Sequence, residues 1–534
     1  MSFASPFPDV EIPATSLFDF LLGTVATDPA LAAKTALVDG TSGAGITYAE
    51  LVTQIEALAG ALAAAGFGKG DVAAVLCPNV PAFVTVFHGI LRAGATATTI
   101  NSLYTAHEIV SQLTDSKASW LFTISAFLPQ ADEAAELVGI PRERVVVLDG
   151  ADGRVSLRDL LTQGHPAPEV SIESGTDLAV LPYSSGTTGR AKGVMLTHRN
   201  LIANVAQGAE LIKLQDDDKV LAVLPFFHIY GMSVLMNAGL WRGATIVTMP
   251  RFDLPEFLRI IAEQHITYVY IAPPVAVALA KHPMVAEYDT SSLKMVFSGA
   301  APLDAELGRK VAERLGCSVR QGYGMSEMSP VSHAIPDDRD DIPLGTVGLT
   351  VPNMECKIVD PATGAEVDYP TDATSAPGEL WCKGPNVMVG YLENAEATAA
   401  TLDADGYLHT GDVATVSPEG YVSIVDRVKE LIKYKGYQVP PAELEALLLS
   451  HDKIADAACI GVNDADGEEV PKAFVVLQPG AEMTEAEVMD FVAGQVAPHK
   501  KVRVVQFIDA IPKSTSGKIL RKDLRARETA STGR

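Results

Sequence analysis

The segment Tyr183-Ser-Ser-Gly-Thr-Thr-Gly-Arg-Ala-Lys-Gly-Val194 joins two short apolar runs that are typical of strands, residues 178–183 and 194–196. Its serines, threonines and glycines offer hydroxyl and backbone N–H donors with little bulk, and Lys192 adds a positive charge, which suits the outer phosphates of a nucleotide. The segment differs from the common P-loop because Gly189 and Lys192 are not adjacent and no hydroxyl residue follows the lysine. Taken alone, this composition also fits a surface loop.

Helical and strand patterns alternate around this segment. Apolar residues recur at helical spacing in residues 48–67, 81–93 and 254–265, and short buried strands are expected at residues 71–76, 94–99 and 267–271. Such alternation indicates an α/β fold with layered, mainly parallel sheets.

The pattern changes after about residue 340, where shorter strands are expected at residues 355–359, 378–382 and 421–425. Residues 440–451 open a new unit with a proline-started helix, followed by strands at 457–461 and 473–477 and a helix at 484–496. We therefore predict a large N-terminal domain, residues 1–425, with a β-rich subdomain at about 340–425. A small, mobile α+β C-terminal lid domain, residues 426–534, would follow a short charged hinge.

Composition limits the possible partners. The 534 residues carry a net charge of −25, from 41 basic and 66 acidic residues, so nucleic acid is not expected as a partner. Residues 513–534 are locally basic, which fits either a solvated tail or a lysine that meets a phosphate. The five cysteines are widely spaced without a CxxC pair, which argues against a disulfide framework or a zinc site. No signal peptide or apolar run of about 18 residues is found, so we expect a cytoplasmic protein without a membrane span.

Further segments suit a nucleotide. Ser298-Gly-Ala-Ala-Pro302 offers small residues just after a strand, and Gln321-Gly-Tyr-Gly-Met-Ser-Glu327 combines glycines with a flat ring and a carboxylate. In the latter, Ser326 and Glu327 can reach a phosphate or Mg²⁺. Tyr407-Leu-His-Thr-Gly-Asp412 places a carboxylate at a tight turn, where it could accept hydrogen bonds from ribose.

Together with the lysine-rich segments 427–438 and 512–518, these motifs resemble the adenylate-forming superfamily of acyl-CoA synthetases, luciferases and adenylation domains. Residues 224–231 (LPFFHIYG), 378–381 (GELW) and 425–438 resemble the 4-coumarate–CoA ligase branch in particular. The resemblance implies an AMP-forming acid–thiol ligase that uses ATP, Mg²⁺ and coenzyme A. It would form an acyl-adenylate with release of pyrophosphate and then transfer the acyl group to coenzyme A with release of AMP.

The resemblance also implies roles for individual residues. The ATP/AMP site would contain Ser184, Ser185, Gly186, Thr187, Thr188, Gly189, Lys192, Ala300, Gln321, Gly322, Tyr323, Gly324, Met325, Ser326, Asp412, Arg427, Lys433, Gln438 and Lys518. Among these, Tyr323 would lie against adenine, Asp412 and Arg427 would fix the ribose, and Glu327 would bind the metal. Lys518 would bridge the substrate carboxylate and the α-phosphate, and Lys433 and Gln438 would replace it after the lid turns about Lys429. The catalytic set would be Lys518, Glu327, His228 and Lys433.

The acyl pocket would be headed by His228 and Tyr230 and walled by Val234, Met295, Ala300, Gly322, Met328, Pro330 and Val331. These small or apolar walls favour a flat aromatic acid of the hydroxycinnamate kind, or alternatively a medium-chain aliphatic acid. A histidine between Phe227 and Ile229 also fits an ordinary core residue.

Arg251, Lys435 and Gly436 would contact coenzyme A, although Arg251 equally fits a surface residue. Relatives usually have a proline before the loop lysine where this chain has Arg190-Ala191, a difference that loosens the loop. Two other functions stay open, namely loading of a separate carrier protein and nucleotide binding without turnover. Either a monomer or a homodimer is compatible with the sequence.

Overall fold

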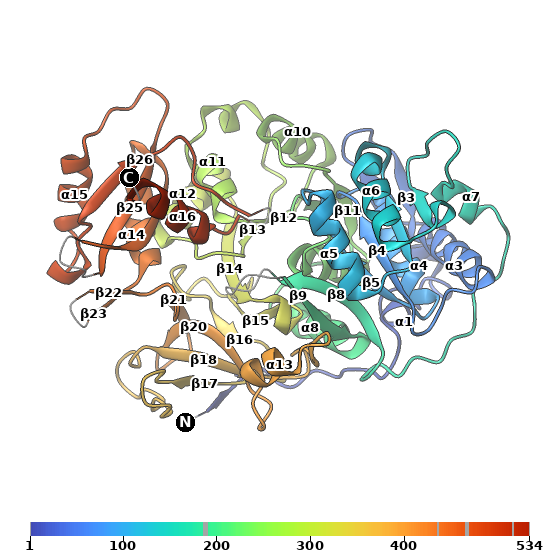
Figure 1. Cartoon of the computed structure of the whole chain (residues 1–534), viewed down its shortest axis with the longest axis horizontal. Coiled ribbons are helices and arrows are strands. Elements are labelled where there is room, and N and C mark those ends of the chain that lie inside the picture. The colour runs from blue at the N-terminus through green and yellow to red at the C-terminus, as the bar shows by residue number, and fades with distance from the viewer. Residues whose placement is uncertain (1, 185–190, 435–436, 465–468, 515–516, 533–534) are drawn as a thin grey trace.

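The computed structural model describes residues 2–184, 191–434, 437–464, 469–514 and 517–532. Three large sheets make up the chain as far as Arg427, and a smaller unit follows at one end of the molecule (Figure 1). Among the described residues, no helix combines the length and the apolar character that a bilayer span requires.

The first sheet has seven strands in the order β19-β9-β8-β5-β4-β6-β7. Its strands are β4 (Val72–Leu76), β5 (Thr96–Thr99), β6 (Trp120–Thr123), β7 (Val145–Val147), β8 (Leu178–Ser184), β9 (Lys192–Thr197) and β19 (Gly390–Tyr391). Strands β4 to β8 run parallel to one another, whereas β9 is antiparallel to β8 and β19 is antiparallel to β9. The phosphate-loop segment therefore joins β8 to β9.

The second sheet has nine strands in the order β16-β15-β14-β13-β12-β10-β11-β2-β3. These are β2 (Thr35–Asp39), β3 (Gly45–Thr47), β10 (Lys219–Ala222), β11 (Thr245–Thr248), β12 (Tyr268–Ile271), β13 (Met295–Ser298), β14 (Ser318–Gly324), β15 (Val331–Ala334) and β16 (Leu349–Thr350). Its central strands, β2 and β10 to β14, are parallel, so the loops that leave their carboxyl ends meet at one edge.

Helices separate and cover the sheets, as a parallel α/β fold requires. In this part they are α1 (Leu17–Leu22), α2 (Pro29–Ala33), α3 (Tyr48–Ala64), α4 (Pro81–Arg92), α5 (Ala106–Ser116), α6 (Leu128–Val138), α7 (Leu157–Leu161), α8 (His198–Ala209), α9 (Ala238–Arg242), α10 (Leu254–Gln264), α11 (Pro273–Lys281), α12 (Ala305–Leu315) and α13 (Ala395–Thr401). A π-helix, η3 (Tyr230–Asn237), precedes α9, and a short 3-10 turn, η5 (Ser326–Met328), follows β14. One connected apolar core runs through both large sheets.

The third sheet has five strands in the order β1-β17-β18-β20-β21. These are β1 (Phe3–Ala4), β17 (Glu355–Val359), β18 (Gly378–Lys383), β20 (Leu408–Val416) and β21 (Val422–Arg427). The expected β-rich texture is present. Strand β21 continues through Arg427, past the residue 425–426 boundary that we predicted, because Arg427 pairs with Asp412 of β20.

The remaining chain forms the C-terminal unit. It contains β22 (Ile432–Tyr434), β23 (Tyr437–Val439), α14 (Pro441–Ser450), β24 (Ile454–Asn463), β25 (Glu469–Leu477), α15 (Glu485–Ala493), β26 (Val504–Phe507) and α16 (Arg521–Thr532). It has an apolar core of its own, in which Ile432, Leu444 and Val475 are fully buried. Its elements match the predicted α+β order, although β24 and β25 are longer than the strands expected at residues 457–461 and 473–477. The exact domain division stays a prediction.

Candidate active site

Two loops meet at the carboxyl edge of the nine-stranded sheet. Ser298 and Gln321 are register partners on β13 and β14, so residues 299–303 leave the sheet beside the last three residues of β14, Gly322 to Gly324. The Gln321 amide ties these loops together, because its oxygen accepts a hydrogen bond from Leu303 N at 3.1 Å and its nitrogen donates to Leu303 O at 3.1 Å. The structure therefore gives this predicted nucleotide residue an internal bracing role.

The glycines of this edge are required by the chain itself. A Cβ on Gly324 would lie 2.2 Å from Pro330 O, and one on Gly322 would lie 2.9 Å from the Phe297 ring. The reason is close packing of β14 against its own neighbours, which places Tyr323 between the two glycines.

Tyr323 and Asp412 are joined directly. The Tyr323 hydroxyl donates to Asp412 Oδ2 at 2.6 Å, and Arg427 Nε lies 3.3 Å from Asp412 Oδ1. Burial raises the pKa of the Asp412 carboxyl, which is only 8% exposed, while Arg427 and Tyr323 oppose that rise. The predicted base and ribose residues thus form one connected group at the end of the third sheet.

Glu327 lies at the mouth of the β8–β9 loop. Its Oε1 accepts hydrogen bonds from Ser184 Oγ at 3.1 Å and from the Tyr391 hydroxyl at 2.8 Å. Lys192 Nζ lies 4.4 Å from the centre of the Tyr391 ring, a cation–π contact. The sequence analysis missed Tyr391, because only the pairing of β19 with β9 brings it to this place.

Lys518 reaches the same site from the C-terminal unit. Its backbone N–H donates to Ser514 Oγ at 3.1 Å, and Ser514 N donates to Lys518 O at 2.8 Å, which closes a tight loop. Burial lowers the pKa of Lys518 and so does Arg427, whereas the carboxylates of Asp412 and Glu327 raise it. Lys518 therefore lies close enough to both carboxylates for their charges to act on its ammonium group.

The loop that carries Lys518 packs on the large domain. Gly517 has φ +82°, in the left-handed region, and a Cβ there would lie 3.0 Å from the Ala272 Cβ. Both the conformation and the space favour glycine before the lysine. The contact of Gly517 with Ala272 holds the loop that carries Lys518 against the N-terminal end of α11.

His228 and Tyr230 lie beside this edge of the sheet. Burial lowers the pKa of His228 to about 3, so its imidazole is neutral at physiological pH. Its Nδ1 accepts a hydrogen bond from Tyr230 N at 3.3 Å. The Tyr230 ring occupies the space beside Gly299, where an added Cβ would come within 2.6 Å of a ring carbon.

A small hollow lies between α8, η3, α9 and β12. Its lining includes Val234 and Val331, two predicted acyl-pocket walls, together with Ser233, Trp241 and Tyr270. The rings of Tyr230 and Tyr270 meet edge to face, with centroids 6.4 Å apart. Neither the Ser233 hydroxyl nor the Tyr270 hydroxyl has a hydrogen-bond partner in the described part of the protein.

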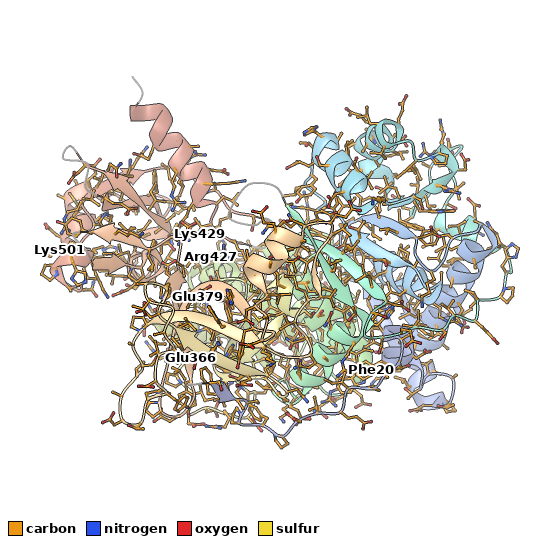
Figure 2. The ribbon with its side chains drawn as sticks, turned by 60° about the horizontal axis from the view of Figure 1, so that its bottom comes forward. Phe20, Glu366, Glu379, Arg427, Lys429 and Lys501 are labelled. Atoms are coloured by element: carbon orange, nitrogen blue, oxygen red, sulfur yellow. The ribbon has the colours of Figure 1, made fainter. Side chains whose placement is uncertain are left out.

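Other predicted site residues lie elsewhere. Met295 begins β13 at the end opposite Ser298, about 10 Å along the strand, so it is not brought to this edge. Arg251 is exposed ahead of α10, and Lys433 is exposed on β22. Lys429 follows β21 at the junction of the two units, where Figure 2 shows it next to Arg427.

Several predictions cannot be placed. Ser185, Gly186, Thr187, Thr188, Gly189, Lys435 and Gly436 lie outside the described residues, as does the side chain of Gln438. Ala300, Met325, Ser326, Met328 and Pro330 follow β13 and β14 at the same edge as Tyr323.

Comparison with known proteins places these features in a family. Residues 28–392 match the AMP-binding enzyme model, and residues 443–518 match the AMP-binding enzyme C-terminal domain model. The chain is 42% identical to 4-coumarate--CoA ligase 3 of Oryza sativa subsp. japonica, over 99% of this chain and 95% of the relative. It is 38% identical to probable 4-coumarate--CoA ligase 1 of Dictyostelium discoideum, over 98% and 97% of the two chains.

Solved structures agree in architecture. The anthranilate CoA ligase AuaEII in complex with anthranoyl-AMP superposes with a TM-score of 0.90 at 26% identity, covering 98% of this chain and 99% of that one. ATP-bound MatB from Rhodopseudomonas palustris gives 0.86 at 31% identity, covering 96% and 99%. The apo form of the same MatB gives 0.77 at 31% identity, covering 96% and 98%.

Proposed function

Since the chain belongs to the AMP-binding enzyme family and to its 4-coumarate–CoA ligase branch, we propose that it activates an aromatic carboxylic acid that carries a hydrogen-bonding substituent. The general reaction is that of an acid–CoA ligase. ATP and the acid form an acyl-adenylate and pyrophosphate, and coenzyme A then takes the acyl group and releases AMP.

The convergence of Lys518 with Asp412 and Glu327 supports this chemistry best. In the first half-reaction a carboxylate oxygen attacks the α-phosphorus, a new P–O bond forms, and the bond to pyrophosphate breaks. Two anions must meet in that step, so a cation held at the meeting point stabilises the transition state most. We assign this role to Lys518, with Lys192 beside the departing pyrophosphate.

A magnesium ion fits the same site. Glu327 is 5% exposed and offers a carboxylate whose Oε1 is oriented by Ser184 and Tyr391. Mg²⁺ in such sites is usually held by one or two carboxylates together with substrate phosphates. Glu327 and the phosphates would hold it, and it would supply positive charge to offset the leaving pyrophosphate.

The choice of acid follows the relatives, which are named 4-coumarate--CoA ligases, and is consistent with the small hollow between α8, η3, α9 and β12. Its walls are mainly apolar, yet two buried hydroxyls, of Ser233 and Tyr270, have no partner among the described residues. A buried hydroxyl without a hydrogen bond costs free energy, so a ligand group that pairs with it gains affinity.

The second half-reaction requires a different set of groups. Lys433 is exposed on β22 while Lys518 occupies the site, so we propose that rotation about Lys429 exchanges them. Arg251, Lys435 and Gly436 are proposed to meet coenzyme A in that second orientation. Delivery to a carrier protein is the alternative acceptor.

A substrate panel tests the proposal. Cinnamate, 4-hydroxycinnamate, benzoate and octanoate are compared by pyrophosphate release with ATP and Mg²⁺, and the thioester is identified by mass spectrometry with coenzyme A or a holo-carrier protein. We expect 4-hydroxycinnamate to exceed octanoate in kcat/KM by at least about tenfold. Preference for octanoate would overturn the acid assignment, and adenylate formation without transfer to coenzyme A would overturn the acceptor.

A further inference from the structure

Helix α11 touches the C-terminal unit at both of its ends. At its N-terminal end, Ala272 packs against Gly517 of the loop that carries Lys518. At the last residue, Lys281 Nζ donates to Leu449 O and to Ile454 O, each at 3.2 Å. Figure 1 shows α11 on the side of the large domain that faces this unit.

The carbonyls that receive Lys281 lie at and just beyond the end of α14. Leu449 is in its last turn, where carbonyls have no intrahelical partner and the helix dipole is negative. A lysine ammonium donates hydrogen bonds to such carbonyls, and its positive charge compensates the negative end of the helix dipole. Burial lowers the pKa of Lys281, and the nearby Asp452 opposes this while Lys310 adds to it, so the contact is partly withdrawn from water.

The large domain holds Lys281 in position. Arg314 of α12 donates to Leu279 O, Ala280 O and His282 O at 3.2, 2.9 and 2.7 Å, which braces the end of α11. The two contact points, Ala272 and Lys281, are about 13.5 Å apart along the helix axis. Contacts at two separated points resist rotation of the C-terminal unit, whereas a single contact would act as a pivot.

We propose that Lys281 is a positioning residue for the first half-reaction, a latch that favours the lid orientation in which Lys518 lies among Asp412 and Glu327. This inference rests on the proposed two-step function. Rotation of the lid to bring Lys433 to the site must break the Lys281 bonds, because they join the two units that move. Lys281 therefore biases the enzyme towards adenylation and opposes thioester formation.

The test separates the half-reactions. Lys281→Met keeps the length of the side chain and removes its charge and donors. We expect the rate of acid-dependent pyrophosphate–ATP exchange to fall about tenfold, since a charge-assisted hydrogen bond is lost. Thioester formation from supplied acyl-adenylate and coenzyme A should stay the same or rise. Lys281→Arg should restore exchange, and Lys69→Met, which removes an ion pair with Asp177 at 2.6 Å within the large domain, should change neither rate.

A second measurement does not need activity. Tryptic cleavage within residues 427–429 of the full-length protein should be at least about threefold faster in Lys281→Met than in wild type or Lys69→Met, because the lid is released. Equal cleavage rates, or an equal loss in both half-reactions, would overturn the latch. If no acid is activated by wild type, the proposed function fails, and the cleavage rates still decide the latch.

Discussion

Asp412 and Arg427 face each other as register partners on β20 and β21, with Arg427 Nε 3.3 Å from Asp412 Oδ1. Strand β21, the last strand of the third sheet, ends at Arg427, the first residue of the junction. Arg427 therefore lies directly beside the buried carboxylate of Asp412, which also accepts a hydrogen bond from Tyr323. The proposed nucleotide site and the start of the C-terminal unit therefore meet at this one side chain.

Asp412→Asn tests the role of that side chain. The substitution keeps the size of the side chain and removes its charge, so hydrogen bonds to Tyr323, Arg427 and the proposed ribose weaken. We expect KM for ATP to rise about tenfold to hundredfold, measured by pyrophosphate release. Asp341→Asn, which alters an exposed pair with Arg339, should leave KM unchanged. An unchanged KM in Asp412→Asn would remove Asp412 from the nucleotide site.

Lys518→Met tests the cation. We expect pyrophosphate–ATP exchange to fall by at least about a hundredfold, because the positive charge at the α-phosphate is lost. Transfer from supplied acyl-adenylate to coenzyme A should be largely kept. Lys513→Met is the matched control, since Lys513 lies in the same loop but pairs with Asp456 at 2.6 Å. Similar losses in both variants would point to loop disruption instead.

The pH dependence of the first half-reaction follows from Lys518. Its pKa in the folded protein is lowered from 10.5 by burial, so the cation is lost as pH rises through that lowered value and the exchange rate falls. Between that lowered pKa and 10.5, the unfolded chain keeps a proton on Lys518 that the folded protein has lost. Within this interval the group therefore makes the free energy of unfolding rise with pH. Lys518→Arg stays charged and should lose the alkaline decline in rate that wild type shows. A decline that persists in Lys518→Arg would assign it to another group.

Gly299→Ala tests the acyl side of the site. The new Cβ would come within 2.6 Å of the Tyr230 ring and displace it. We expect KM for the acid to rise about tenfold while KM for ATP changes little. Gly175→Ala adds the same methyl group where no atom lies within 4 Å, and it should have no effect. Equal changes in both KM values would contradict the assignment of Tyr230 to the acyl pocket.

Arg521→Met tests the stability of the C-terminal unit. Arg521 forms a double hydrogen bond with the buried Glu445 at 2.8 and 2.7 Å, and removal of one partner leaves the other uncompensated. We expect a loss of about 3–5 kcal/mol in the free energy of unfolding, measured with denaturant. Lys500→Met, which breaks a more exposed pair with Glu443, should cost about 1 kcal/mol or less.

Local chemistry made most of this architecture predictable. Helix periodicity and proline positions predict α4, α10 and α14 nearly to the residue, and the nucleotide role of the motif around Tyr323 stays a prediction. Strand order was not predictable. Tyr391 reaches Glu327 only because β19 pairs with β9, a relationship between distant segments that no local pattern records.

The same limit explains the other differences. Met295 has the apolar side chain expected of a pocket wall. Its place at the first residue of β13, away from the edge at Ser298, depends on where the strand begins. Lys281 looks like an ordinary helix-ending lysine, and its bonds to Leu449 and Ile454 exist only once two folded units meet. Gln321 sits in a nucleotide motif, yet its amide is used by Leu303.

The assembly of Ser184, Glu327 and Tyr391 around one carboxylate has a consequence for biosynthesis. The hydroxyl groups that orient Glu327 are all present only after the ribosome has synthesised the chain past Tyr391. The ammonium group of Lys518 is added only when synthesis is nearly complete. A nascent chain halted in between would have its seven- and nine-stranded sheets largely complete and still lack the lysine that we propose as the catalytic cation.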